Sequence, residues 1–309
     1  MQFIDSVGNT PLVLLDHINP ERERVKVYAK AELFNPSGSV KDRAAKAMVL
    51  DGLKTGKLSN KKILIDATSG NTGIAYAMLG ALYGFKVQLV IPANVNFARK
   101  GLMKAYGAEI IESDPLEGSD GAYFKVRDIV SKEPDRYFYP DQYNNPANWK
   151  AHYETTAEEI WKQTEGKITH FVTGGGTTGT FTGTSKRLHE LNPAVHTLLM
   201  QPDGPFHGIE GNKHLETTER PGIFDESLVE KIVPVATETA YKTVHELART
   251  EGILAGISSG ANVSAALEVV REEIPKVSAL LKDAMEHVAE LSVPLVVDIH
   301  SGKNWAEAK

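Results

Sequence analysis

The 309-residue chain contains no cysteine. This absence excludes disulfide bonds, thiolate metal sites and a cysteine nucleophile. No apolar run reaches the roughly 20 residues that span a bilayer. The N-terminal residues carry no basic segment ahead of their short apolar run, so we expect neither a membrane helix nor a signal peptide.

Basic residues are also few relative to acidic ones. The chain has 34 lysines and arginines against 40 aspartates and glutamates, for a net charge of −6. This balance argues against a general affinity for nucleic acid or for an anionic membrane. The histidines show no metal-ligand spacing, and we expect no metal site. We therefore expect a cytoplasmic enzyme or binding protein that acts on small molecules.

Apolar, β-rich runs alternate with helical stretches, a pattern typical of parallel α/β architecture. No repeat of 20 to 50 residues and no flexible linker is present, so we expect two lobes built by a chain that crosses between them. The predicted strands are 25–30, 62–67, 86–91, 108–113, 168–173, 195–201, 252–257 and 293–299. The predicted helices are 41–55, 72–83, 97–106, 119–132, 147–164, 180–191, 237–250 and 260–273.

A loop rich in glycine and hydroxyl groups, TSGNTG at residues 68–73, follows a predicted strand and precedes a predicted helix. In open α/β sheets, ligands bind at such junctions. The amides and hydroxyls of this loop suit a carboxylate at a helix N-terminus. An ordinary N-cap turn explains the same residues without a ligand.

A second loop at the same kind of junction, TGGGTTGT at residues 173–180, suits a phosphate because its glycines allow backbone amides to converge on an anion. Gly174, Gly176 and Gly179 also match the dinucleotide fingerprint, with Asp203 placed as a ribose-binding acid. A nicotinamide dehydrogenase is therefore a rival interpretation, and a tight turn without a ligand is another. An ATP-type P-loop is disfavoured because no G-K-[ST] sequence follows.

A third loop, GISSGAN at residues 256–262, offers Ser258 and Ser259 either as helix caps or as donors to a ligand ring atom.

A fourth segment, NPSGSVKDRAA at residues 35–45, places Lys41 at a predicted helix start. A cation there faces the positive end of the helix dipole, so a free ammonium is unexpected. Together these features suit pyridoxal phosphate (PLP) with an amino-acid substrate, and partial desolvation would lower the pKa of the Lys41 amine for Schiff-base formation.

With these residues in view, the sequence resembles the cysteine synthase and cystathionine β-synthase branch of the fold-type-II PLP enzymes. The motif GTTGT followed by PGIF resembles the B-type cysteine synthases most. The matching stretches are VGNTPLV (7–13), NPSGSVKDRAA (35–45), TSGNTGIA (68–75), DQYNNPANW (141–149), GGGTTGTFTG (174–183), PGIF (221–224) and EGILAGISSGA (251–261), with a weaker match around 298–302, where His300 replaces an aspartate.

The resemblance implies a tryptophan synthase β-like fold with two open, twisted, mainly parallel sheet domains and PLP in the cleft between them. The larger domain would comprise residues 1–37 plus 148–309 and carry the phosphate loop and Ser258. The smaller, mobile domain would comprise residues 38–147 and carry Lys41 and the substrate-carboxylate loop. A homodimer is expected.

The resemblance also implies roles for individual residues. Lys41 matches the Schiff-base lysine, and Ser258, ahead of Ser259, matches the serine at the pyridine nitrogen. Asn71 matches the asparagine that bonds the cofactor's ring hydroxyl. The substrate carboxylate would meet Thr68, Ser69, Thr72 and Gln142, and the cofactor phosphate would meet Gly176, Thr177, Thr178, Gly179 and Thr180.

The implied reaction is a β-replacement that makes L-cysteine from O-acetyl-L-serine and sulfide, or another sulfur donor, through an α-aminoacrylate. A neutral serine at the pyridine nitrogen favours such elimination over transamination. O-phosphoserine sulfhydrylase activity, cystathionine β-synthase activity and an inactive regulatory homologue are open alternatives. In the long loop 202–224, Lys213 is expected either to meet a leaving-group phosphate or an anionic sulfur donor, or to be a solvated surface lysine.

Overall fold

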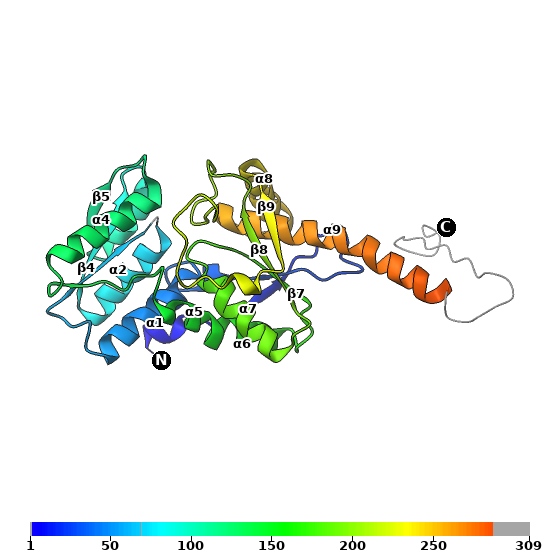
Figure 1. Ribbon diagram of the computed structural model, residues 1–309, viewed down its shortest axis with the longest axis horizontal. Coiled ribbons are helices and arrows are strands. Elements are labelled where there is room, and N and C mark those ends of the chain that lie inside the picture. Colours follow the sequence, from blue (N-terminus) through cyan, green and yellow to red (C-terminus); the bar gives the residue numbers. More distant parts are fainter. Residues whose placement is uncertain (1, 69, 287–309) are drawn as a thin grey trace.

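A computed structural model describes residues 2–68 and 70–286, with side chains described as far as residue 272. Two lobes lie side by side, each built around its own sheet, and the long helix α9 extends outward from the second lobe (Figure 1). The chain passes from the N-terminus across both lobes before it completes either of them. This crossing is the arrangement that the absence of a linker predicts.

The first lobe contains a parallel sheet with strand order β5-β4-β3-β6. Alternate residues of its strands enter two apolar cores: Leu64 and Leu89 pack against α1 and α2, whereas Ile65 and Val90 pack against α4. Helices on both faces explain why consecutive residues of β3 and β4 are buried. The elements are β3 (Ile63–Ala67), β4 (Lys86–Pro92), β5 (Glu109–Ser113), β6 (Tyr137–Phe138), α1 (Lys41–Lys54), α2 (Asn71–Tyr83), α3 (Phe97–Ala105) and α4 (Gly118–Lys132).

The second lobe contains the parallel sheet β7-β8-β9. Leu198, Met200 and Val233 of this sheet pack against α8 and α9 in one core, and Leu188 of α7 joins a smaller core. The elements are β7 (His170–Gly174), β8 (His196–Pro202), β9 (Lys231–Val235), α7 (Gly179–Leu191), α8 (Thr237–Glu246), α9 (Ile257–Glu286), the short 3₁₀ helix η4 (Glu226–Leu228) and the π-helical turn η5 (Leu247–Glu251).

A helical segment connects the lobes and packs against both of them. It consists of α5 (Pro146–Ala151), the π-helical turn η3 (His152–Thr156) and α6 (Ala157–Gln163). Helix α5 contacts α1 of the first lobe and α7 of the second. Single π-turns inside helices are frequent at functional sites.

The N-terminal segment contributes to the apolar cores of both lobes, although it precedes the first lobe in sequence: Ile4 and Val7 pack into the first-lobe core, and residues further along pack into the second. Strands β1 (Leu12–Leu14) and β2 (Tyr28–Lys30) pair antiparallel, flanked by the 3₁₀ helices η1 (Phe3–Ser6) and η2 (Glu32–Phe34). Leu15 and Val27 beside these strands pack with Leu247 and Val263. Residues more than 200 positions apart in the sequence therefore share one core.

The predicted helices and most predicted strands are confirmed, and the expected strand 252–257 is wrong. Residues 252–256 form no helix or strand, because Gly252 is left-handed at φ +68° and Leu254 is 82% exposed. Prediction missed β1, β6 and β9. The first two are very short, and β9 contains Pro234, which an edge strand tolerates. The expected strand 293–299 and His300 lie outside the described residues.

Among residues 2–68 and 70–286, no helix, α9 included, is both long and apolar enough to cross a bilayer.

Lys213 anchors the long loop between β8 and β9 to the first lobe. Its ammonium lies 2.7 Å from Asp120 Oδ1 of α4 and 4.8 Å from the centre of the Tyr143 ring, and its backbone N–H donates to Gly175 O at 2.8 Å. Lys213 is only 5% exposed, so the expectation of a solvated surface lysine is wrong. The ion pair instead joins the two lobes.

We predict that Lys213→Ala lowers the free energy of unfolding by about 1–3 kcal/mol, because it leaves the Asp120 carboxylate without its partner. Urea unfolding measures the change. Lys132→Ala is the matched control, since it removes an exposed i,i+4 pair with Asp128 and should change stability by about 0.5 kcal/mol or less. Equal effects of the two substitutions would contradict the prediction.

Candidate active site

Lys41 is the first residue of α1, and the turn before it leaves its amine in a dry environment. The Lys41 N–H donates to Ser39 Oγ at 3.3 Å. Burial lowers the pKa of the Lys41 ammonium, and the Glu32 carboxylate opposes this shift only partly. Within the described part of the chain, no carboxylate forms an ion pair with Lys41. The lysine is thus prepared to act as a neutral amine.

The carboxylate expected at the start of α1 is Asp42. Its Oδ2 accepts from the Ser37 backbone N–H at 2.7 Å, and its other oxygen accepts from the Ser37 hydroxyl. Asp42 is fully buried, and this burial raises its pKa. Asp42, the residue after the lysine, therefore interacts with the positive end of the α1 dipole. Lys41 remains available for chemistry.

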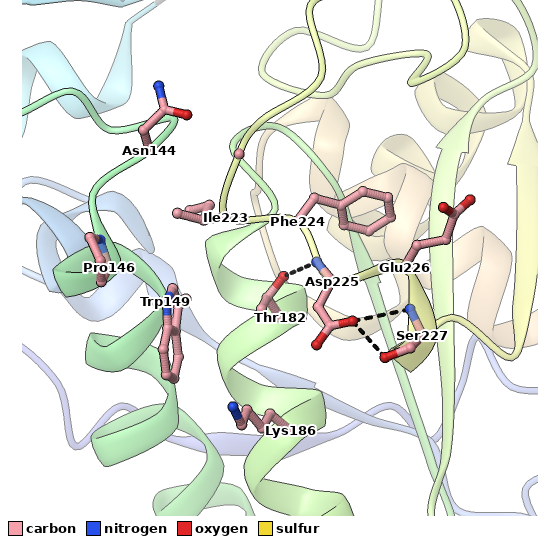
Figure 2. A pocket seen from close by; sticks show the side chains of 11 residues that line it. Asn144, Pro146, Trp149, Thr182, Lys186, Ile223, Phe224, Asp225, Glu226 and Ser227 are labelled. Carbon is pink, nitrogen blue, oxygen red and sulfur yellow. Dashed lines mark hydrogen bonds between the residues drawn. The ribbon is translucent and has the colours of Figure 1, made fainter.

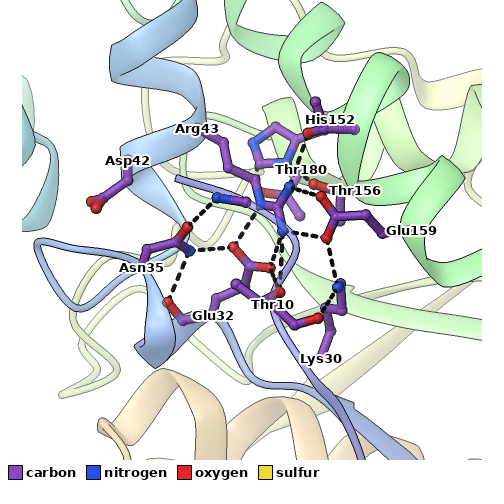
Figure 3. A network of polar contacts seen from close by, with 12 residues as sticks. Thr10, Lys30, Glu32, Asn35, Asp42, Arg43, His152, Thr156, Glu159 and Thr180 are labelled. Carbon is purple, nitrogen blue, oxygen red and sulfur yellow. Dashed lines mark hydrogen bonds and ion pairs between the residues drawn. The ribbon is translucent and has the colours of Figure 1, made fainter. Parts of the chain in front are cut away.

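A buried ion network fixes the first turn of α1 (Figure 3). The Arg43 guanidinium, 3% exposed as a residue, donates to Glu32 and Glu159 at 2.7–2.8 Å. Lys30 donates to the same Glu159 at 2.7 Å. Burial opposes ionisation of Glu159, but the bonds from Arg43 and Lys30 outweigh it and lower the pKa of that carboxyl to about 2. Lys41 is therefore held in place by charges that come from both sides of α1.

The loop after β3 is shaped by its own hydroxyl. Thr68 Oγ1 accepts from the N–H of Gly70 at 3.0 Å and of Gly73 at 3.2 Å, so this side chain caps the turn. Asn71 is exposed at the first position of α2, and Thr72 is buried. Ser69 lies outside the described residues.

Gln142 connects this loop to the segment before α5. Its Nε2 donates to Ala67 O at 2.6 Å, and its Oε1 accepts from Thr72 Oγ1 at 3.0 Å. Gln142 is 5% exposed. The structure thus brings together Thr68, Thr72 and Gln142, which sequence analysis assigned to one substrate-carboxylate site.

The loop 174–180 between β7 and α7 is packed too closely for side chains at its glycines. A methyl group at Gly176 would lie 2.2 Å from Gly211 O, and one at Gly179 would lie 2.1 Å from Asn148 Oδ1. Thr178, at the N-cap of α7, has φ +65°, a left-handed conformation that is costly for a threonine. The first amides of α7 have no intrahelical acceptor, and such helix N-termini bind phosphate readily.

His152 lies against the first turn of α7. Its Nε2 lies 3.3 Å from Thr180 Oγ1, and its Nδ1 lies 3.0 Å from Thr156 Oγ1 (Figure 3). Burial lowers the pKa of His152 to about 3, and the charges of Arg43 and Lys41 act in the same direction. The imidazole beside the glycine-rich loop is therefore neutral.

Ser258 and Ser259 are both half-buried in the first turn of α9. The Ser259 N–H donates to Gly256 O at 2.9 Å. Among the described residues, no side-chain contact distinguishes Ser258 from Ser259 as the partner of a cofactor ring.

A surface groove of about 550 Å³ lies apart from these residues. It is formed by α5, α7 and the segment 222–227, with Trp149, Lys186 and Phe224 in its wall (Figure 2). None of the residues that sequence analysis assigned to the cofactor or substrate lines it. The groove therefore does not define the candidate active site.

Sequence analysis missed two residues that hold the site together. Asn148 donates both to Gln142 O at 2.7 Å and to Thr177 Oγ1 at 3.0 Å. Asp66 lies under the substrate loop and accepts from the Ala67 N–H at 2.8 Å and the Tyr76 hydroxyl at 3.0 Å. Asn148 falls within DQYNNPANW, so that motif was the available signal, whereas an aspartate inside the apolar strand ILIDA was the signal for Asp66.

Comparisons with known proteins agree with this geometry. A family model described as "Pyridoxal-phosphate dependent enzyme" matches residues 4–281. A protein named cysteine synthase from Aquifex aeolicus is 54% identical over 86% of this chain and 82% of its own length, and cysteine synthase B from Escherichia coli is 43% identical over 86% of both. The crystal structure of a hydrogen sulfide-producing enzyme from Fusobacterium nucleatum superposes with a TM-score of 0.82 at 37% identity, covering 88% of this chain and 93% of that one.

We predict that Asp66 makes stability depend on pH. Burial raises the pKa of its carboxyl from the ordinary 3.8 to about 8, against the hydrogen bonds from Tyr76 and Ala67. The folded state therefore holds a proton that the unfolded state releases above pH 3.8, and stability falls as pH rises towards 8.

The test compares wild type with Asp66→Asn by urea unfolding between pH 5 and 9. Wild type should lose up to about 1.4 kcal/mol per pH unit more than the variant below pH 8, and the difference should then level off. Asp128→Asn, on the exposed face of α4, is the control and should follow wild type. Parallel curves for wild type and Asp66→Asn would show that Asp66 does not titrate in this range.

Proposed function

The chain belongs to the family of pyridoxal-phosphate dependent enzymes, and we propose that it acts as a cysteine synthase, making L-cysteine from O-acetyl-L-serine and sulfide. The observation that carries this proposal is the Lys41 amine, whose pKa is lowered by burial and which has no ion-pair partner among the described residues, together with the close-packed, glycine-rich N-terminus of α7. The predicted fold-type-II architecture and the predicted PLP cofactor are confirmed. A nicotinamide dehydrogenase does not fit this family.

The described residues fit PLP. Gly176 and Gly179 leave the backbone of the α7 N-terminus open where side chains would collide, which suits a phosphate. We propose that residues 176–180 hold that phosphate, that Lys41 binds the aldehyde carbon, and that Asn71 and Ser258 contact the ring. Bound PLP supplies an electron sink for negative charge at the substrate's α-carbon.

The chain's own groups then have distinct tasks. Thr72 and Gln142, with Ser69 and the amides of the 68–72 loop, bind the substrate carboxylate, and Thr68 shapes that loop. Lys41 removes the α-proton as a general base, because burial keeps its amine pKa low. The sulfur nucleophile comes from outside, since the chain has no cysteine.

Lys213 supports acetate, rather than phosphate, as the leaving group. A phosphate leaving group calls for a free cation at the site. The Lys213 ammonium is instead engaged by Asp120 and packed on Tyr143. We therefore favour O-acetylserine over O-phosphoserine as substrate.

Three further features are part of the proposal. The larger domain comprises residues 1–37 plus 148–309 and the smaller one residues 38–147, supported by the separate sheets of the two lobes. The chain forms a homodimer, and it works in the cytoplasm.

The proposed substrate is tested by measuring cysteine formation from sulfide with O-acetyl-L-serine, O-phospho-L-serine and L-serine in turn, and cystathionine formation from L-serine and homocysteine. O-acetylserine should give the highest kcat/KM, by about tenfold or more, which corresponds to roughly 1.4 kcal/mol. A preference for O-phosphoserine would refute the argument from Lys213.

Lys41→Ala should abolish turnover, with a loss of about 10² or more from the missing general base alone. After borohydride reduction of wild type, mass spectrometry should find the cofactor attached to Lys41. Lys54→Ala is the control, because it changes an exposed lysine at the other end of the same helix. Attachment to another lysine would remove Lys41 from this role.

A further inference from the structure

Asn148 occupies the junction between the two loops that the proposed function requires. It lies on α5 and is 2% exposed. Its side-chain amide donates to the backbone carbonyl of Gln142 at 2.7 Å and to the hydroxyl of Thr177 at 3.0 Å. The other polar atom of the amide, Oδ1, packs directly on the backbone of Gly179.

These contacts complete a continuous chain of hydrogen bonds through the site. Thr72 and Ala67 bond to the Gln142 side chain, the Gln142 carbonyl bonds to Asn148, and Asn148 bonds to Thr177. The chain begins at the loop after β3 in the first lobe and ends at the loop before α7 in the second. Every member is neutral, so salt should not weaken the connection.

We propose that Asn148 is a positioning residue that holds the phosphate loop in its binding conformation and, with the same side chain, sets the position of Gln142 for the amino-acid substrate. The loop needs such support because the left-handed backbone of Thr178 is energetically unfavourable. This conformation persists only when contacts with neighbouring residues stabilise it. The inference rests on the proposed assignment of residues 176–180 to the cofactor phosphate.

The phosphate role is tested by titrating the full-length apoprotein with PLP and with pyridoxal, which lacks the phosphate, and following the fluorescence of its three tryptophans. Asn148→Ala should weaken PLP binding by about tenfold, the loss expected for one buried hydrogen bond and the loop it orders. Pyridoxal binding should stay within about twofold of wild type. A general loosening of the fold would instead weaken both ligands equally, and that result would overturn the proposal, as would no change in either.

The substrate role is tested in the PLP-loaded enzyme. Asn148→Ala should raise the KM for O-acetylserine by about fivefold or more and change kcat less, because Gln142 loses the bond that sets its position. An unchanged KM would overturn this half of the proposal.

Two further variants keep the test decisive. Asn148→Ser retains a short donor and should give intermediate values, and it replaces Asn148→Ala if that variant does not fold. Asn19→Ala is the matched control, since Asn19 is 1% exposed and also donates to a backbone carbonyl, that of Val25; it should leave the PLP-to-pyridoxal ratio unchanged. If the wild type binds PLP but forms no cysteine, the proposed function is refuted and the inference about Asn148 is not. The ratio of PLP affinity to pyridoxal affinity is measured without turnover.

Discussion

The buried guanidinium of Arg43 is the constraint on which the rest of the site depends. A charge taken out of water is tolerated only when every partner is in place, and the partners of Arg43 come from the N-terminal segment and from α6. Helix α1 packs its other residues into the first lobe, yet its first turn is bound to residues of the second. Arg43 thus ties the helix that begins with Lys41 to the N-terminal segment and to α6.

Neutral groups, in contrast, surround the reacting centre. His152 is uncharged at any ordinary pH, Asp66 keeps its proton up to about pH 8, and the links through Gln142 and Asn148 are between uncharged groups. Lys213 and Arg43 are cations whose charge is taken up by carboxylates. The electrostatic field in the active site is consequently set by the charges of the cofactor and the substrate. These charges interact more strongly there than they would in water.

Local patterns predicted much of this arrangement. Apolar runs located the buried parallel strands, and the glycine and hydroxyl loops located the ends of β3 and β7, because strand and helix signals depend on residues close in sequence. The strand expected at 252–257 failed because its apolar run has no neighbouring strand to pair with among the described residues. The burial of Lys213 could not be predicted, and the roles of Asn148 and Asp66 were signalled by their motifs without being specified, for a related reason: each depends on partners 10 to 93 positions away.

The shared core of Leu15, Val27, Leu247 and Val263 has a consequence for synthesis on the ribosome. The apolar side chains of the N-terminal hairpin emerge first, but their partners follow more than 200 residues later. At synthesis rates of about 5 to 20 residues per second, that interval is roughly 10 to 45 s. Residues 41–138, which form the sheet and helices of the first lobe, have time to fold meanwhile. The nascent chain thus carries an uncovered hydrophobic hairpin through most of its translation, and a chaperone that shields short apolar segments would act on this end of the protein.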